Sequence, residues 1–185
     1  MTTPPAMDEP GTPREAIGAA DLFRDHAAFV ARFLARLGVP RDDVEDLVQE
    51  VFLTAHRRGG FVPGLARPTT WLAEIALRVA STQRRSRRRK PVHASDGLDH
   101  AAARDGDPVE RAVAREALAR VERALAGMDL DRRAVFVLFE IEGQGCDVIA
   151  AGLGIPVGTV YSRLHAARKE FLEVYRSLAG EGRSP

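Results

Sequence analysis

The stretch Asp43-Val44-Glu45-Asp46-Leu47-Val48-Gln49-Glu50-Val51-Phe52-Leu53-Thr54-Ala55-His56 decides how this chain is interpreted. At helical spacing its apolar residues form one stripe, while its acidic and amide residues occupy the other side. No Lys or Arg occurs after position 41 until Arg57. The pattern predicts a helix over residues 41–58 that buries one side and presents an acidic surface outward. Taken alone, it favours an ordinary amphipathic helix with a solvated acidic side.

The segments on either side of this helix are predicted to be helical as well. Apolar residues recur at spacings of three and four over residues 21–37, and Gly38 ends that helix. Residues 61–68 contain too much Pro and Gly for regular structure and predict a loop. Thr69 or Thr70 can cap the next helix, which buries Leu72 and Ile75 and runs into a block of basic residues at 84–90.

The net charge of +1 over 185 residues conceals a strong asymmetry. Residues 21–90 sum to +6, yet within them the acids gather at 42–50 and the bases at 84–90. Two surfaces of opposite sign suggest two partners of opposite sign. A chain of this length forms one medium domain or two small ones.

Several classes of protein are disfavoured by composition. No apolar run approaches the roughly 20 residues that a membrane span needs, and the Pro-rich, acidic start does not resemble a signal peptide. We therefore expect a cytoplasmic protein with a disordered tail at 1–20, another tail at 179–185, and no additional C-terminal domain. The single cysteine, Cys146, excludes an internal disulfide and a cysteine-built metal site, and is expected to be a small buried residue.

The C-terminal part carries a second clear pattern. Residues 91–107 are rich in Asp and Gly and predict a flexible linker. Helical spacing then resumes, with a helix predicted over residues 131–142 that buries Leu138 and Ile141. A short helix over 144–152, a tight turn at 153–156 and a longer helix from Val157 follow. The two helices would pack through Ile149, Leu153, Ile155, Val160 and Leu164. This arrangement favours a helix-turn-helix that binds DNA over an ordinary helical hairpin. Its second helix would present Thr159, Tyr161, Ser162, Arg163, His165, Arg168 and Lys169.

With these motifs in this order, the chain resembles the extracytoplasmic-function (ECF) group of bacterial RNA polymerase sigma factors, in the sigma-70 family. The resemblance covers about residues 21–178. It rests on the acidic stretch 43–53, on Thr70-Trp71-Leu72-Ala73-Glu74-Ile75-Ala76, and on Gly158-Thr159-Val160-Tyr161-Ser162-Arg163-Leu164-His165-Ala166-Ala167-Arg168. The implied fold is all-α, with two small helical domains joined by a flexible linker. The N-terminal domain would span residues 21–90 and the helix-turn-helix domain residues 108–178.

The resemblance implies a role for each surface. The acidic helix would bind the β′ clamp of core RNA polymerase, and the C-terminal domain would approach the β flap. Core binding would use Asp43, Asp46, Gln49 and Glu50. The −10 element of the promoter would be recognised and melted by Phe61, Arg67, Thr70, Trp71, Arg78, Thr82, Arg84 and Arg85, although Trp71 is expected chiefly in the core. The −35 element would be read by the seven residues given above for the second helix.

Four positions depart from the pattern of many relatives, so the resemblance does not imply a particular promoter sequence. Arg78 stands where many carry Asn, and Thr82 where many carry Asp. The recognition helix also lacks the first of two common arginines, since His165-Ala166 follows Leu164, and Tyr161 replaces a basic or small residue.

Enzymatic interpretations find little support. The five histidines are scattered without metal-ligand spacing, no Gly-rich loop precedes a Lys-Ser or Lys-Thr pair, and no cofactor or metal is expected. The alternatives left open are a stand-alone helix-turn-helix regulator and a sigma-like decoy. An anti-sigma factor is the further partner implied. Because exposed charge pairs are weak and screened by salt, we expect the two domains to form a loose, salt-sensitive ensemble in the free protein.

Overall fold

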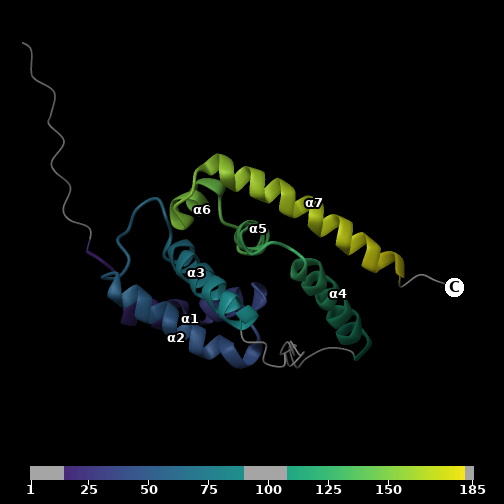
Figure 1. The fold of residues 1–185 in the computed structure, drawn as a ribbon, viewed down its shortest axis with the longest axis horizontal. Helices are drawn as coiled ribbons and strands as arrows, with labels where there is room; N and C mark the ends of the chain where they lie inside the picture. The colour runs from purple at the N-terminus through teal and green to yellow at the C-terminus, as the bar shows by residue number, and fades with distance from the viewer. Residues whose placement is uncertain (1–14, 90–107, 182–185) are drawn as a thin grey trace, which may run out of the picture.

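The structure, a computed structural model, describes residues 15–89 and 108–181 of the chain. These residues are helical, and their only strand-like feature is one isolated bridge, so the predicted all-α class is confirmed (Figure 1). The predicted linker, residues 91–107, lies outside the described part. The elements are α1 (Ala19–Arg36), α2 (Arg41–Arg57), α3 (Pro68–Arg89), α4 (Pro108–Ala126), α5 (Leu130–Phe136), the π-helical η1 (Val137–Ile141), α6 (Cys146–Leu153) and α7 (Val157–Glu181).

The N-terminal domain packs α1, α2 and α3 around one apolar core. The helix spacing predicted from the sequence places Phe33, Val51 and Ile75 in this core without solvent exposure. Gly38 ends α1 with a φ of 86°, a conformation that glycine adopts without steric cost, and Val39 N–H then donates to Leu34 O at 3.1 Å. This turn brings α2 back antiparallel along α1, so that the acidic side of α2 points away from the core.

The ordered chain begins earlier than the sequence predicts. The tail was expected to extend to residue 20, yet Ile17 forms an antiparallel bridge with Phe61, with N–H···O distances of 2.8 and 3.0 Å, and α1 begins at Ala19. Gly60 makes this bridge possible, because a Cβ there would lie 2.4 Å from the Ile17 carbonyl oxygen. At the other end α7 continues to Glu181, into the predicted tail at 179–185.

The helix predicted over residues 131–142 is interrupted by a π-helical turn. Within η1, Glu142 N–H donates to Val137 O at 3.0 Å, an i→i+5 bond that widens the helix and shifts the phase of the residues after it. As a result Val137 is fully buried, whereas Ile141, expected in the core, is 39% exposed. The 3.6-residue period that predicted Ile141 as buried does not hold across such a turn.

The helix-turn-helix is formed by α6 and α7. Gly154 ends α6 in the left-handed conformation with a φ of 65°, and α7 starts two residues later, after Pro156. The predicted apolar contacts between the two helices are present, since Ile149, Leu153, Val160 and Leu164 are all buried. Cys146 is also buried, as expected.

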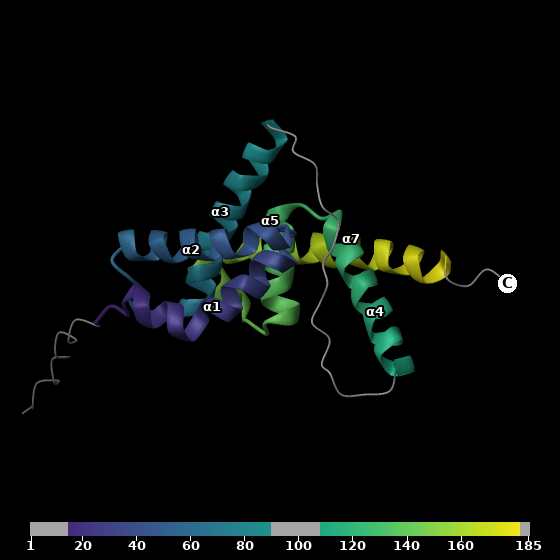
Figure 2. The same ribbon diagram turned by 90° about the horizontal axis from the view of Figure 1, so that it is seen from below.

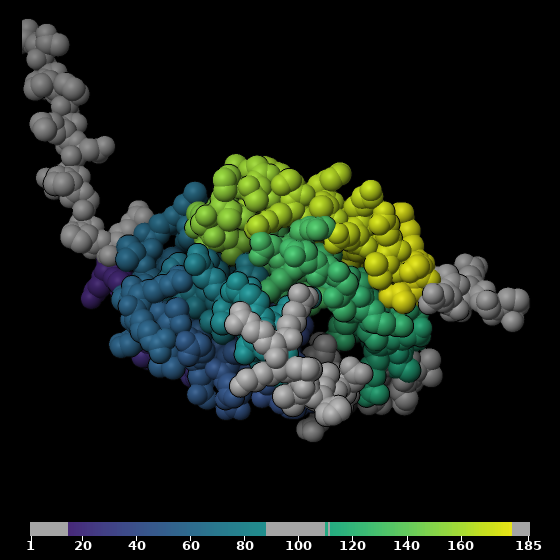
Figure 3. Space-filling model, viewed as in Figure 1, coloured from purple at the N-terminus to yellow at the C-terminus, as the bar shows by residue number. Residues whose placement is uncertain are grey.

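The two domains share one continuous core, which the sequence does not predict. Helix α3 lies between the N-terminal helices and the C-terminal ones, and it contacts α1, α2, α5 and α6 (Figures 1 and 2). The space-filling view places the C-terminal helices directly against the N-terminal half (Figure 3). The expected loose ensemble is therefore not what the structure contains: apolar surface, which salt does not screen, holds the domains together.

The two domains approach each other closely at Gly152 of α6. A Cβ at this position would lie 2.4 Å from the Thr70 Cβ and 2.8 Å from the Thr70 carbonyl carbon. Because one of these atoms is backbone, no side-chain rotation can make room for even a methyl group. We call this contact, with the surrounding α3–α6 packing, the domain seam. An ion pair between Arg36 of α1 and Glu142, just after η1, joins the domains at a second place outside this seam.

The seam predicts the effect of Gly152→Ala. Alanine is intrinsically better than glycine inside a helix by about 1 kcal/mol, but here its methyl group must push α6 away from α3. We expect the variant to remain helical and to have a larger radius of gyration in small-angle X-ray scattering than the wild type.

The matched control is Gly158→Ala, a helical glycine in α7 with no atom within 4 Å of its added Cβ. It should leave the radius unchanged. The wild-type radius should also stay the same from low to high salt. Equal radii for Gly152→Ala and the wild type would contradict the assignment of Gly152 to the seam.

Candidate polymerase and DNA interfaces

The acidic side of α2 divides into residues that face solvent and one that does not. Asp46 and Gln49 are exposed, and Glu50 is half-exposed, with its Oε1 3.1 Å from Arg57 Nη1. Asp43 instead accepts hydrogen bonds from Gln83 and Arg87 of α3. Of the four residues predicted to bind core polymerase, three are thus available to a partner, and Asp43 ties α2 to α3.

Leu53 extends this exposed row and was missed by sequence reasoning. It lies three residues after Glu50 and seven after Asp46, so it shares their side of the helix, and it is 50% exposed. The spacing alone could have placed it there. The row therefore combines negative charge at its N-terminal end with an exposed apolar side chain at its C-terminal end.

The loop before α3 buries the aromatic residue predicted to contact DNA. Phe61 is 4% exposed and packs on Trp71, with ring centroids 5.7 Å apart. Thr70 is fully buried at the seam, where its Oγ1 accepts from Arg67 N–H at 3.0 Å and donates to Arg67 O at 2.9 Å. The residues that the loop exposes are Arg67 and two apolar side chains absent from the prediction, Val62 and Leu65.

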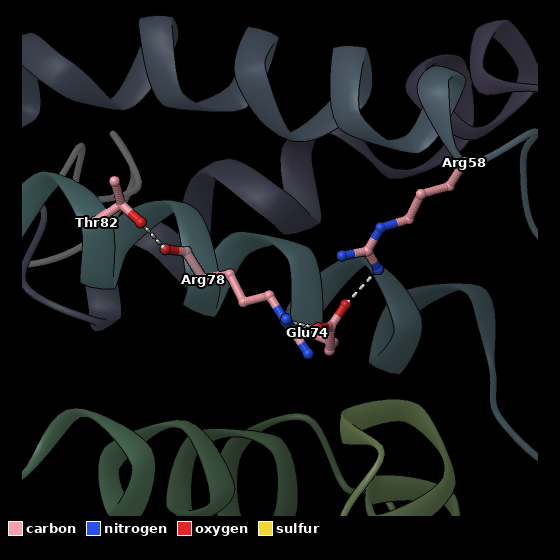
Figure 4. Close-up of polar contacts among 4 residues, drawn as sticks. All are labelled: Arg58, Glu74, Arg78 and Thr82. Atoms are coloured by element: carbon pink, nitrogen blue, oxygen red, sulfur yellow. Dashed lines mark hydrogen bonds and ion pairs between the residues drawn. The ribbon is translucent and has the colours of Figure 1, made fainter.

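Along α3 a buried carboxylate organises the basic residues. Glu74 is 8% exposed; Arg58 Nη1 donates to its Oε2 at 2.6 Å, and Arg78 donates to its Oε1 (Figure 4). Thr82 Oγ1 donates to the Arg78 carbonyl oxygen at 3.0 Å. Arg78 is thus held in place along the helix, and most of its side chain remains exposed.

In this conformation the outer side of α3 faces the C-terminal domain across a cleft. The cleft has a volume of about 390 Å³. On the α3 side it is lined by Arg78, Thr82 and Arg85, and on the other by Asp131, Ile155 and Arg163. The structure therefore brings predicted −10 residues and one predicted −35 residue to the two walls of one cleft.

The predicted reading residues of α7 separate into two sets. Tyr161, His165 and Lys169 are exposed at i, i+4 and i+8 and form one row, with exposed Ser162 beside it; we call these four the α7 row. Ser162 Oγ donates to the carbonyl oxygen of half-buried Thr159 at 3.1 Å. The α7 row is free of ion pairs within the described residues.

The two arginines of this helix that were predicted to read DNA are engaged within their own domain. Arg163 Nη2 donates to Asp131 Oδ2 at 2.6 Å. Arg168 Nε donates to Glu140 at 2.6 Å, and its guanidinium carbon lies 5.1 Å from the centre of the Phe139 ring. Sequence spacing could not reveal these partners, because they come from α5 and η1.

Comparison with known proteins matches both domains to one family. Residues 22–90 match the model of Sigma-70 region 2, and residues 118–171 match that of Sigma-70 region 4. The ECF RNA polymerase sigma factor SigL of Mycobacterium tuberculosis is 35% identical over 148 residues, which cover 79% of this chain and 82% of SigL. The chain belongs to the ECF group of the sigma-70 family. This sigma factor is also 32% identical to RNA polymerase sigma factor HrpL of Pseudomonas syringae over 88% of this chain and 89% of HrpL.

Two solved structures share the fold. RpoE from Bartonella quintana, in complex with the anti-sigma factor NepR, aligns with a TM-score of 0.64 at 23% identity, over 83% of this chain and 94% of that one. CnrH, in complex with the cytosolic domain of CnrY, aligns with a TM-score of 0.57 at 25% identity, over 86% and 88% of the two chains.

Membership in this family makes the protein a transcription initiation factor that acts with core RNA polymerase at promoters. Within the described residues, no helix is both long enough and apolar enough to span a membrane. In the same residues, no three His, Cys, Asp or Glu side chains are grouped so as to hold a metal ion.

The Glu74 contacts predict a stability effect. Replacing Glu74 with Ala removes two charge-assisted hydrogen bonds from a nearly buried site, and each such bond contributes about 1.5–3 kcal/mol. We expect the free energy of unfolding in urea to fall by about 2 kcal/mol or more. Glu50→Ala, which removes a largely exposed ion pair, should change it by less than about 1 kcal/mol; equal losses would contradict a structural role for Glu74.

Proposed function

We propose that the exposed row Asp46, Gln49, Glu50 and Leu53 docks on the β′ clamp of core polymerase. The carboxylates would supply charge complementarity to a basic partner, and Leu53 an apolar anchor beside them. Asp43 has a supporting role in this proposal, because its carboxylate holds α3 against α2. This fixes the docking helix relative to the helix that would engage DNA.

We propose that α3 and the loop before it engage the −10 element. Arg78, Thr82 and Arg85 would follow the phosphates of the separated strand, which a row of cations suits. Val62 and Leu65, exposed on the loop, would make the apolar contacts with an unstacked base that Phe61, buried under the loop, is not placed to make here. In this proposal Phe61 holds the loop in place by packing between it and Trp71 of α3.

For the −35 element we propose that the α7 row enters the major groove. A helix-turn-helix presents one row of its second helix to base edges, and Tyr161, Ser162, His165 and Lys169 are the exposed polar residues of that row. Arg163 and Arg168 would act mainly through Asp131 and Glu140, by fixing α7 on its domain. The β flap would be the polymerase surface nearest to this domain.

The −10 contact requires the domains to separate, whereas the α7 row is exposed in the closed arrangement as well. Thr70 is buried under α6, and the exposed outer side of α3 faces the C-terminal domain across a cleft that would have to widen to admit a DNA strand. We infer that core polymerase opens the seam, and that an anti-sigma factor keeps the protein silent by occupying the surfaces of both domains. Since its partners are the polymerase and promoter DNA, we place the protein in the cytoplasm.

The observation that carries this proposal is the presence of both regions in one chain, each with its own exposed polar row. A stand-alone helix-turn-helix regulator needs neither the acidic row nor α3, and is disfavoured for that reason. A sigma-like decoy would have the acidic row but would not start transcription. Co-purification with core polymerase followed by run-off transcription separates these three functions. Only a sigma factor both co-purifies with core polymerase and starts transcription from the promoter.

The docking row predicts the effect of Asp46→Arg. A cation placed on this row would face a cationic partner surface, and such like-charge contacts cost several kcal/mol. We expect core affinity to fall at least about tenfold in a competition assay, with the thermal midpoint unchanged because Asp46 is exposed. Asp25→Arg, a charge reversal at an exposed acid on α1 and outside the row, is the control and should change core affinity far less. If the Asp46 variant competed for core polymerase as well as the wild type does, this row would not be the docking surface.

The α7 row predicts distinct outcomes for its members. Alanine at Tyr161 or His165 should alter the preferred −35 sequence, because each lost base contact costs about 1–3 kcal/mol of discrimination. Alanine at Lys169 should weaken binding to all sequences alike if it contacts phosphate. Binding to a library of −35 variants distinguishes these effects, and Arg176→Ala, an exposed cation further along α7, is the control. If every variant bound the library as the wild type does, α7 would not be the reading helix.

A further inference from the structure

A cationic cavity lies where the two domains meet. Its volume is about 480 Å³, within the range of small-molecule sites. Three arginines line it, Arg84 and Arg87 from α3 and Arg133 from α5, together with Gln83. None of its lining residues is an Asp or a Glu. The remaining lining is apolar or backbone: Leu37, Gly38, Val39, Pro40, Ala80, Ala126 and Leu130.

Arg133 is the unusual member of this group. It is 5% exposed, its Nη2 donates to the Leu125 carbonyl oxygen, and its Nε is buried without a hydrogen-bond partner. Burial, with a smaller contribution from the like charge of Arg84, lowers the pKa of its guanidinium to about 10. The side chain is therefore still charged at neutral pH, and no carboxylate pairs with it within the described residues.

Only one of the three arginines is neutralised. Arg87 pairs with Asp43, whereas Arg84 has no ion pair in the part of the chain that the structure describes. Two uncompensated guanidinium groups therefore border one cavity, one of them buried. Such a charge is costly unless an anion pairs with it. Guanidinium groups match phosphate oxygens especially well, through paired N–H donors in a planar fork.

We propose that this cavity binds the phosphate groups of an anionic ligand, with Arg84 and Arg133 as the principal contacts and Gln83 and Arg87 beside them. Arg84 comes from the N-terminal domain and Arg133 from the C-terminal one. The site is complete only while the seam is closed. By linkage, a bound phosphate group stabilises the closed arrangement and opposes the open one that promoter binding requires.

Pyrophosphate is a suitable probe, because it carries two phosphate groups and no base. The full chain is titrated by calorimetry, and its thermal midpoint is followed at constant ionic strength with potassium chloride as the reference salt. We expect saturable binding and a midpoint that rises with pyrophosphate more than with chloride. If chloride at equal ionic strength raised the thermal midpoint as much as pyrophosphate does, the proposal would be overturned, because the rise would then come from general screening.

Two variants test the assigned contacts. Arg84→Gln, at an exposed position, should weaken pyrophosphate binding about tenfold or more, the usual effect of losing one charge-assisted contact. Arg133→Met should abolish the pyrophosphate-dependent rise in midpoint. Without ligand, however, its midpoint should be no lower than that of the wild type, since an unpaired buried charge has been removed. A purely structural role for Arg133 would instead lower the midpoint whether or not pyrophosphate is present.

Arg85→Gln is the matched control, because Arg85 is the next residue of α3, is exposed, and does not line this cavity. It should bind pyrophosphate as the wild type does. Binding that is unchanged by Arg84→Gln and Arg133→Met, or equally weakened by Arg85→Gln, would refute the site.

A further comparison identifies the source of the phosphate. Gly152→Ala, which opens the seam, should lose pyrophosphate binding and retain binding of a single-stranded oligonucleotide. If the phosphates belong to the DNA backbone, the opposite pattern is expected: the oligonucleotide competes with pyrophosphate, and Gly152→Ala binds both. None of these measurements uses polymerase or a promoter, so their failure would leave the proposed function standing.

Discussion

The direct contact of α6 with the first turn of α3 is the constraint on which this arrangement depends. Gly152 has no side chain, and Thr70 directs its hydroxyl back to its own chain at Arg67, so the two helices meet almost backbone to backbone. Around this contact α3 is buried on two sides, and its buried residues include small ones such as Ala73 and Ala80. One helix thus packs against both domains, and neither domain is complete in its apolar packing without it.

Electrostatic interactions arrange the rest of α3. The helix carries many more bases than acids, and the structure assigns a carboxylate to some of these bases and not to others. Glu74 binds Arg78 and so fixes this side chain in the middle of the outer side of α3. Asp43 of α2 binds Arg87 and so orients α3 against α2. Arg84 and Arg85 are left without ion pairs among the described residues. Where a basic side chain has a partner, it supports the fold; where it has none, it is available for a ligand.

Much of the fold could be predicted from the sequence, because helix periodicity and glycine stops are local signals. The end of α1, the bounds of α2, the helix-turn-helix, and the burial of Ile149 and Leu164 follow from them. The π-helical turn could not be predicted, since its extra residue breaks the period on which the prediction rests. The seam could not be predicted either: Gly152 inside a helix indicates a close approach but does not name its partner.

For the candidate sites, residue type and spacing identified the helices but not which side chains are free. Asp43, Arg163 and Arg168 have the same character as their neighbours in the sequence, yet each is bound by a residue about thirty or more positions away. Exposed apolar residues such as Leu53 and Val62 are not predicted as contact residues from the sequence, because hydrophobic residues are usually assigned to a core. The roles of these side chains remain predictions.

The bridge between Ile17 and Phe61 joins the segment before α1 to the base of the loop before α3. Everything between these two residues, including α1 and α2, is thereby closed into a ring by two backbone hydrogen bonds. The exposed tip of the loop, with Val62 and Leu65, begins one residue beyond that closure. The base of the loop is therefore fixed by the segment before α1, so the position of its exposed tip depends on residues far earlier in the sequence.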